Sequence, residues 1–239
     1  MFPPTGVGYD RAITIWSPDG RLYQVEYAME AVRRGSITLG IKTEDGIVLA
    51  AEVRSMALLE ESSRGYKIVA VDDHIGVSFS GWFSDARVLI DKARYYAQVH
   101  RLLYDEPIEV ELLARRICDI LQIYTQHGGV RPFGVALLIG GVDFTGPQLI
   151  YVEPSGTYYR FLAHAIGTGA EELRGLLEKN YRKDLHLDEA VTLAVRSLNK
   201  VIEGGLKVEN IEVAVIERKT MKFRKLKREE IRKLIEEIR

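Results

Sequence analysis

The order of hydrophobic periodicities along the chain constrains its fold more than any other feature of the sequence. Apolar residues recur at every second position in some segments and at every third or fourth position in others, which predicts strands and helices. The order is strands, two helices, strands, two helices and one more strand. Elements grouped in such runs favour antiparallel sheets with helices on their outer faces. We therefore expect an α+β protein in which two stacked sheets lie between two helix layers, a four-layer αββα sandwich.

The same patterns place each element. Period-two runs predict strands at 36–42, 47–51, 66–71, 75–79, 135–139, 148–152, 157–163 and 211–216. Apolar stripes at helical spacing predict helices at 22–34, 85–103, 109–126, 170–181, 188–203 and 227–239.

The first helix, 22–34, is extra to the sandwich, because it precedes all the strands and carries an apolar stripe of its own. A strong turn, Ser17-Pro18-Asp19-Gly20, comes before it. We expect a single domain over 1–239. Its parts are a flexible Pro/Gly-rich tail, an extension with the turn and helix, the sandwich, and a charged C-terminal strand and helix, at 1–8, 9–35, 36–217 and 218–239.

Charge and cysteine content limit the kind of function. The 33 basic and 34 acidic residues nearly cancel, so no overall field favours nucleic acid or a membrane surface. The longest uncharged stretches reach about 11 residues, against the roughly 20 that a bilayer requires. One cysteine, Cys118, allows neither an internal disulfide nor a cysteine-based zinc site. The N-terminus lacks the basic region of a signal peptide. We expect a cytoplasmic protein without metal or cofactor.

Several motifs resemble one family. These are Tyr9-Asp10-Arg11, the run from Ser17 to Ala28, Asp85-Ala86-Arg87, Tyr124-Thr125-Gln126 and the run from Gly128 to Gly134. Together they are similar to the α subunits of the 20S proteasome, in particular the archaeal ones, over about 9–216. The resemblance implies the fold of the N-terminal-nucleophile hydrolases, which agrees with the layers expected from periodicity.

The resemblance also implies a function. Seven α subunits form an outer ring that gates substrate access, directs assembly of the β ring and receives the C-terminal tails of AAA ATPase activators. Unfolded proteins pass through it to the peptidase sites of the β subunits. The helix at 22–34 would lie on the outer face of the ring and help to build its contacts.

A catalytic role for the chain itself is the alternative. By resemblance, Ser36, Glu52 and Lys67 occupy the positions of the nucleophile, its acidic partner and the catalytic lysine. Such a nucleophile uses its own free α-amine as the base. Ser36 has 35 residues before it and therefore an amide nitrogen. We expect no catalytic residue in this chain.

The activator pocket implied by the resemblance contains Lys67, Gly35 and Leu22. A lysine ammonium can bind the C-terminal carboxylate of an ATPase through a charge-assisted hydrogen bond. The plain alternatives are a solvated lysine at a strand end and a glycine that ends a helix.

Two further groups are implied by the resemblance. Tyr9, Asp10, Pro18 and Tyr27 match a cluster that holds the N-terminal tails of the ring in an open arrangement. The pore below this gate would be lined by His127, Gly128, Gly129 and Val130. His127 departs from the usual tyrosine, and histidine changes its charge within the physiological pH range.

The remaining features have simpler interpretations. Gly167-Thr168-Gly169 lacks the third glycine of a dinucleotide fingerprint and is expected to be a strand-to-helix turn. Met29 stands where a basic residue is common, which puts a salt bridge to Glu26 in doubt, and the bulky Trp82-Phe83 indicates a local packing change. The segment 218–228 has seven basic and no acidic residues, so nucleic-acid binding is a third hypothesis.

Overall fold

The computed structural model describes residue 9, residues 12–54 and residues 66–238. Within them, two antiparallel sheets have five strands each. Sheet A has the order β10 (Lys222–Lys225), β9 (Ile211–Glu217), β2 (Gly46–Glu52), β1 (Thr38–Lys42) and β8 (Ala163–Ile166). Sheet B has the order β3 (Ile68–Asp72), β4 (Ile75–Gly81), β5 (Val135–Asp143), β6 (Gly146–Val152) and β7 (Tyr158–Arg160).

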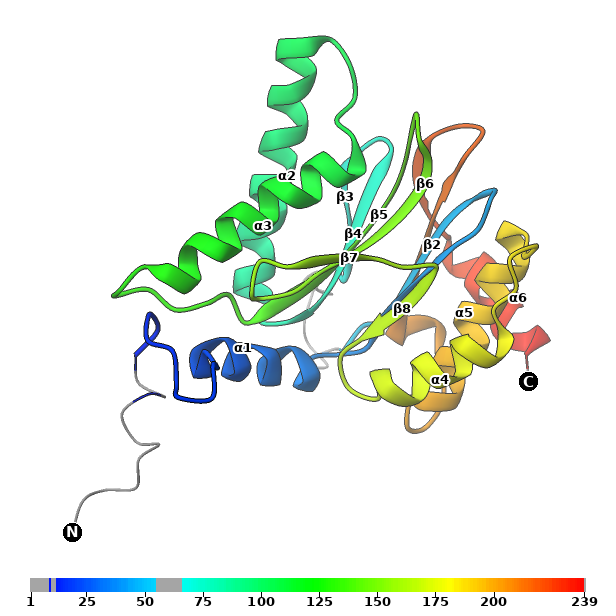
Figure 1. Cartoon of the computed structure of the whole chain (residues 1–239). Coiled ribbons are helices and arrows are strands. Elements are labelled where there is room, and N and C mark those ends of the chain that lie inside the picture. The colour runs from blue at the N-terminus through cyan, green and yellow to red at the C-terminus, as the bar shows by residue number, and fades with distance from the viewer. Residues whose placement is uncertain (1–8, 10–11, 55–65, 239) are drawn as a thin grey trace, which may run out of the picture.

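Helices cover the outer face of each sheet. Sheet B is covered by α2 (Phe83–Tyr104) and α3 (Val110–Gln126), and sheet A by α4 (Ala170–Asn180) and α5 (Leu187–Val201), with α6 (Arg228–Glu237) packed beside α5. Figure 1 shows the layers from left to right as helices, sheet B, sheet A and helices. The expected αββα sandwich is therefore confirmed.

Apolar side chains fill all three spaces between the layers. Between the sheets, Leu49 and Ile216 of sheet A meet Leu138 and Leu149 of sheet B, and all four are buried. Residues of β2 and β5 are buried on both faces, because each of these strands has a sheet on one side and helices on the other. Burial of a large aliphatic side chain contributes about 1.5–3 kcal/mol.

The N-terminal helix α1 (Tyr23–Arg34) lies outside both helix layers. It packs against the ends of β4 and β5, and it buries Ala28 and Val32 there. Figure 1 shows it crossing below the two sheets. The extra apolar stripe expected from the sequence thus has its own surface at one end of the sandwich.

One expected strand, 157–163, is wrong. The structure divides this segment into β7, which pairs with β6 in sheet B, and β8, which pairs with β1 in sheet A. The chain crosses between the sheets at Phe161 and Leu162, where the N–H of Phe161 still bonds the carbonyl of Leu149. A single straight strand cannot pair in both sheets, and period-two alternation does not show where a strand leaves its sheet.

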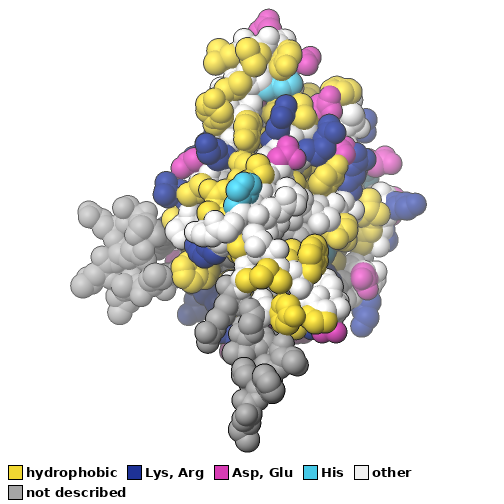
Figure 2. All heavy atoms as spheres, turned by 60° about the vertical axis from the view of Figure 1, so that its left-hand side comes forward, with side chains coloured by type: hydrophobic (Ala, Val, Ile, Leu, Met, Phe, Trp, Pro, Cys, Tyr) yellow, Lys and Arg dark blue, Asp and Glu magenta, His cyan; other side chains and the backbone are white. Residues whose placement is uncertain are grey.

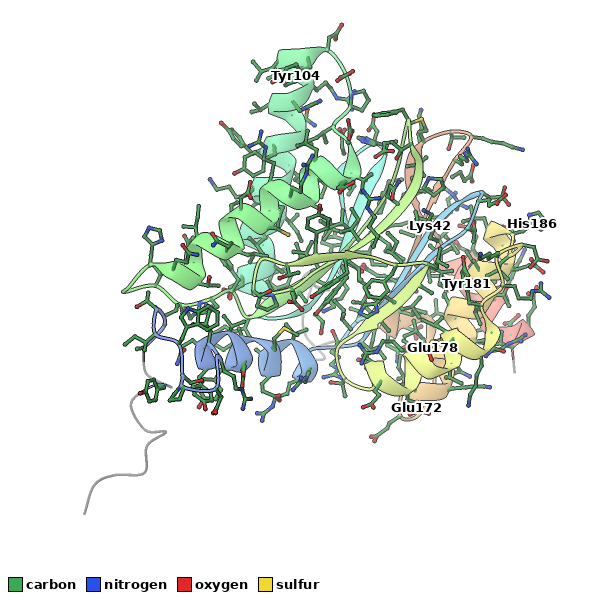
Figure 3. All side chains as sticks on the ribbon, in the orientation of Figure 1. Lys42, Tyr104, Glu172, Glu178, Tyr181 and His186 are labelled. Carbon is green, nitrogen blue, oxygen red and sulfur yellow. The ribbon has the colours of Figure 1, made fainter. Side chains whose placement is uncertain are left out.

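Polar contacts join the helix layer to the β1–β2 hairpin. Tyr181, directly after α4, donates a hydrogen bond from its hydroxyl to the carbonyl of Lys42 at 3.1 Å (Figure 3). Nearby, Nδ1 of His186 lies 2.8 Å from Oδ2 of Asp45, and this hydrogen bond raises the pKa of His186 and lowers the pKa of Asp45. These contacts hold the turn between β1 and β2 against the segment that connects α4 to α5.

Candidate functional site

The two ends of α1 place two of the predicted pocket residues. Leu22 is the N-cap of the helix and Gly35 its C-cap. The backbone of Gly35 has φ −67°, so a left-handed conformation does not explain the glycine. Space does, because a Cβ there would lie 2.3 Å from both the nitrogen of Gly81 and Oγ of Ser80. Gly35 therefore lets the end of α1 rest directly on β4.

Lys67 lies in a bend directly before β3, and only 8% of it is exposed. Its Nζ is 4.2 Å from the ring centroid of Phe79, a cation–π contact. Burial and the nearby Arg54 lower the pKa of Lys67 to about 8, while Glu52 and Glu212 act in the opposite direction. The ammonium is charged at neutral pH but poorly hydrated, so a carboxylate that reached it would gain a strong hydrogen bond.

A cavity of about 630 Å³ lies beside Gly35. Its walls include Tyr27 and Trp82, which are 53% and 60% exposed, and the cation of Arg34. The structure thus brings Gly35 of the predicted pocket together with Tyr27 of the predicted gate cluster. Lys67 and Leu22 do not line this cavity within one chain.

The turn before α1 has the expected form. The N–H of Gly20 bonds the carbonyl of Ser17 at 2.9 Å, with Pro18 inside the turn, and Gly20 has φ +72°. Tyr9 is half-buried and Tyr27 is exposed, whereas Asp10 lies outside the described residues. The predicted gate contacts therefore stay predictions.

Because position 29 is methionine and not a basic residue, Glu26 forms its salt bridge with another residue. Its carboxylate pairs with Arg21, five residues earlier, through two hydrogen bonds. Met29 instead lines a different cavity, between α1 and α4.

The predicted pore residues form one loop after α3. His127 caps the helix, and its Nδ1 donates to the carbonyl of Ile123 at 2.9 Å, because a carbonyl can only accept. A Cβ on Gly128 or Gly129 would meet nothing within 4 Å, and Gly129 has φ +85°. Val130 is exposed. The loop projects freely from the sandwich, as Figure 1 shows at the far end of α3.

The segment after this loop is held firmly. Arg131 donates two hydrogen bonds to the carboxylate of Asp85, and the N–H of Gly134 donates a third at 2.8 Å. The guanidinium of Arg131 also lies over the ring of Trp82, 5.4 Å from its centroid. Trp82 therefore contacts both the Gly35 cavity and the base of the loop 127–130.

The residues of the catalytic alternative have other hydrogen-bond and ring partners, although Glu52 lies close enough to Lys67 to act on its pKa. Glu52 pairs with Arg54 at 2.9 Å, and Lys67 faces the ring of Phe79. None of the hydrogen bonds among the described residues joins Ser36, Glu52 or Lys67 to one another. The carbonyl group of Gly35 belongs to the peptide bond with Ser36. It accepts hydrogen bonds from the N–H and the hydroxyl of Thr168 at 2.8 and 3.0 Å.

The remaining candidate groups from the sequence have structural roles. Gly167 and Gly169, with φ +102° and +76°, form the predicted turn between β8 and α4. Cys118 is buried, and its burial raises the pKa of the thiol to about 12. In the part of the chain that the structure describes, no three metal-binding side chains come together. No described helix is long and apolar enough to cross a membrane.

The basic C-terminal segment uses part of its charge internally. Arg224 pairs with Glu230 at 2.8 Å, and Lys225 pairs with Glu212 at 3.1 Å. Arg224 thereby holds β10 against α6, and Lys225 holds it against β9. These contacts do not favour the nucleic-acid hypothesis.

Glu212 was not predicted from the sequence. Its Oε2 accepts hydrogen bonds from the backbone N–H groups of Lys67 and Ile68, at 3.1 and 2.9 Å. A single acidic residue in an expected strand gives no local signal for a partner about 145 positions away. Only the stacking of sheet A on sheet B brings them together.

Comparison with known proteins agrees with this architecture. The proteasome subunit family matches residues 32–216, and the N-terminal signature of proteasome A-type subunits matches residues 9–31. Proteasome subunit alpha of Methanocaldococcus jannaschii is 51% identical over 238 residues, covering 100% of this chain and 90% of that protein. The subunit alpha of Methanothermobacter thermautotrophicus is 49% identical, covering 100% and 96%, and that of Pyrococcus abyssi is 50% identical, covering 99% and 90%.

Both matches fit the structure described above. The signature ends within α1, and the family match continues from there through β9. The signature therefore corresponds to the extra segment that precedes the sandwich, and the second match to the sandwich itself. The chain belongs to the proteasome subunit family and carries the N-terminal signature of its α-type members.

Proposed function

We propose that this chain is a non-catalytic subunit of the outer ring of a cytoplasmic proteasome core particle. The observation that carries the proposal is the tight packing of the Gly35–Ser36 junction at the end of α1. Gly35 fits tightly against Ser80 and Gly81, and its carbonyl is bonded to Thr168. Cleavage there would release α1 from the sandwich and is not supported by this packing. As long as the chain is uncleaved at this junction, Ser36 lacks the free amine that an N-terminal nucleophile requires.

The test uses a particle assembled from this chain and its β subunit. Ser36→Ala should leave peptide hydrolysis unchanged, and the intact mass of the chain should show no cleavage at Ser36. Loss of hydrolysis in Ser36→Ala, with the particle still assembled, would instead establish the catalytic alternative.

Ring formation is supported by the positions of Leu22 and Gly35. They flank a helix of 12 residues, which separates them by roughly 20 Å at about 1.5 Å per residue. A single short pocket can contain both only if neighbouring copies contribute one each. Such a head-to-tail contact closes into a ring when its rotation permits. Resemblance to the family supports seven copies.

Exposed apolar residues support assembly with further subunits. Leu102, Leu103 and Tyr104 end α2 and are 84%, 69% and 64% exposed. Figure 2 shows apolar side chains gathered at this projecting end of the molecule, and Figure 3 labels Tyr104 there. A contiguous apolar tip of this kind is typical of an interface.

Native mass spectrometry tests the ring directly. The chain of 27.0 kDa should give a species of about 189 kDa, or its double, by itself, or a heavier cylinder once the β subunit is added. If the mixture forms no cylinder, the ring proposal is wrong.

We further propose that the ring binds the C-terminal carboxylates of ATPase activators through Lys67, with Gly35 and Leu22 nearby. The buried ammonium over Phe79 supports this role, because it is charged at neutral pH and poorly solvated. Lys67→Ala should abolish ATPase-stimulated degradation of an unfolded protein while the ring still assembles.

The gate and pore complete the proposal. Tyr9, Asp10, Pro18 and Tyr27 would hold the N-terminal tails open, and the loop His127–Val130 would line the pore beneath. The open space around Gly128 and Gly129 supports a loop that faces a channel. A deletion of 2–9 should raise hydrolysis of a large unfolded protein without an activator, while hydrolysis of a tripeptide changes little.

A further inference from the structure

The backbone at Lys67 is held by a carboxylate from the other sheet. Oε2 of Glu212, on β9 of sheet A, accepts the N–H of Lys67 and the N–H of Ile68. Consecutive N–H groups of a regular strand point to opposite sides. Their convergence on one oxygen therefore defines the bend in which Lys67 lies, directly before β3.

The carboxylate is itself held in place. Nζ of Lys225, on β10, donates to the same Oε2 at 3.1 Å and lies 4.6 Å from the ring centroid of Tyr66. The side chains of Glu212 and Lys225 are 18% and 32% exposed, so water screens their pairing only partly. Glu212 thus joins β9, β10 and the start of β3 at one point.

This arrangement decides where the ammonium of Lys67 can be. The bend directs the side chain over Phe79, and β3 is the edge strand of sheet B, paired on one side only, with β4. On the side away from β4, the start of β3 is held by Glu212. Without these hydrogen bonds, the bend would lose the side-chain anchor that the described residues provide, and the side chain of Lys67 would adopt several positions instead of one.

We propose that Glu212, supported by Lys225, is a positioning residue that fixes Lys67 for binding an activator carboxylate. This inference rests on the proposed role of Lys67. Glu212 also places a negative charge close to Lys67, but that charge competes with an incoming carboxylate. The benefit of Glu212 is therefore geometric, through its two backbone hydrogen bonds.

Three substitutions separate geometry from charge. Glu212→Ala removes both backbone acceptors, whereas Glu212→Gln keeps an oxygen that can accept the same two N–H groups without the charge. Lys225→Met keeps the carboxylate but removes its partner. Glu217→Ala is the matched control, since Glu217 lies at the end of the same strand and makes no side-chain hydrogen bond among the described residues.

The first measurement is binding to the assembled α–β particle. The probe is a peptide of about ten residues with the C-terminal sequence of the ATPase from the same organism, compared with the same peptide as its C-terminal amide. Glu212→Ala should weaken binding of the free-carboxylate peptide about tenfold, and Lys225→Met two- to fivefold. Glu212→Gln and Glu217→Ala should stay within about twofold of the unsubstituted particle. Binding of the amide should be weak in all of them.

The second measurement does not depend on activator binding. Trace acetylation, read by mass spectrometry, gives the reactivity of the Lys67 amine in the same particles. Glu212→Ala should raise that reactivity several-fold, because the amine leaves its place over Phe79, and Glu212→Gln should not. A purely structural role for Glu212 would lower thermal stability without changing Lys67 reactivity.

The outcomes are distinguishable. If Lys67→Ala leaves peptide binding unchanged, the proposed docking role is wrong, while Lys67 reactivity still reports on positioning. Unchanged reactivity and binding in Glu212→Ala would overturn the inference. Equal losses in Glu212→Ala and Glu212→Gln would also overturn it, because charge and not hydrogen-bond geometry would then be responsible. If Glu212→Ala does not assemble, Glu212→Met, which fills similar space without accepting either N–H group, replaces it in the comparison with Glu212→Gln.

Discussion

The carboxylate of Asp85 and the guanidinium of Arg131 form two hydrogen bonds, 2.8 and 2.6 Å long, between the first turn of α2 and the segment after the loop 127–130. The N–H of Gly134 donates to the same carboxylate. Burial alone would raise the pKa of Asp85, but the bonds from Arg131 and Gly134 outweigh it and lower the pKa. Asp85 therefore stays ionised and anchors the base of a loop that is otherwise free.

Asp85→Ala should lower the free energy of unfolding by about 2 kcal/mol, because Arg131 and the N–H of Gly134 both lose their acceptor. The urea midpoint of the purified chain measures this change. Asp91→Ala is the control, since Asp91 makes an exposed pair with Arg87 at 3.4 Å on the same helix. Its effect should stay below about 0.5 kcal/mol. Equal effects of the two substitutions would show that the Asp85 anchor adds nothing.

Gly35→Ala should prevent stable folding or shift α1, because its Cβ would collide with the backbone of Gly81 and with Ser80. Gly175→Ala is the matched control: Gly175 lies inside α4, and a Cβ there meets nothing within 4 Å. It should stabilise the chain by up to about 1 kcal/mol, since alanine is the better helix former. Urea unfolding of both variants, followed by circular dichroism, checks the pair. A Gly35→Ala chain as stable as the unsubstituted one would contradict the tight contact.

The sequence predicted the layers well because the amphipathic periods extend over whole elements. It predicted the residues of the site only through the resemblance. It placed Gly35 correctly at the end of the helix, but it did not show why a glycine is needed there. Helix capping is a local property, whereas the contact of Gly35 with Ser80 and Gly81 depends on how α1 rests on β4.

The missed role of Glu212 and the wrong strand at 157–163 have one physical origin. Contacts between the layers produce no periodic pattern in the sequence. The hydrogen bonds that the N–H groups of Lys67 and Ile68 donate to Glu212 cross from sheet B to sheet A. The crossing at Phe161 is likewise decided by which strands are available for pairing in each sheet.

His164 should make the chain sensitive to acid. It is buried, with its ring stacked 4.0 Å from that of Phe161, and burial together with Arg174 lowers its pKa to about 4. The folded state therefore binds fewer protons than the unfolded state between about pH 6.5 and 4. Stability contributed by neutral His164 is complete above pH 6.5 and is lost as the pH falls through this window.

His164→Phe should reduce the loss of unfolding free energy between pH 7.5 and pH 5 by about 2 kcal/mol. Urea titrations at both pH values in the two chains measure it. His100→Phe is the control, because His100 is only partly buried, at the side of α2. The same pH dependence in His164→Phe as in the unsubstituted chain would show that other groups cause the acid sensitivity.

Lys67 gives the docking proposal a pH dependence that an ordinary lysine would not show. Its pKa of about 8 means that half of the side chains are neutral at that pH. Only the ammonium form attracts a carboxylate, so the affinity of the particle for an activator tail should fall about tenfold between pH 7 and pH 9. A lysine with the ordinary pKa would stay charged over this range. Lys67→Arg should bind with a flat profile, and Lys67→Ala should bind weakly throughout.

The titration of Lys67 does not destabilise the fold at high pH, so unfolding caused by Lys67 cannot explain a loss of tail affinity between pH 7 and pH 9. Because its pKa is lowered in the folded chain, the unfolded state binds more protons between about pH 8 and 10.5, and the contribution of Lys67 to stability rises with pH in that window. Tail binding and thermal stability measured on the same particles at pH 7, 8 and 9 therefore separate the two effects. Equal affinity at all three values in the unsubstituted particle would show that a charged Lys67 does not bind the tail.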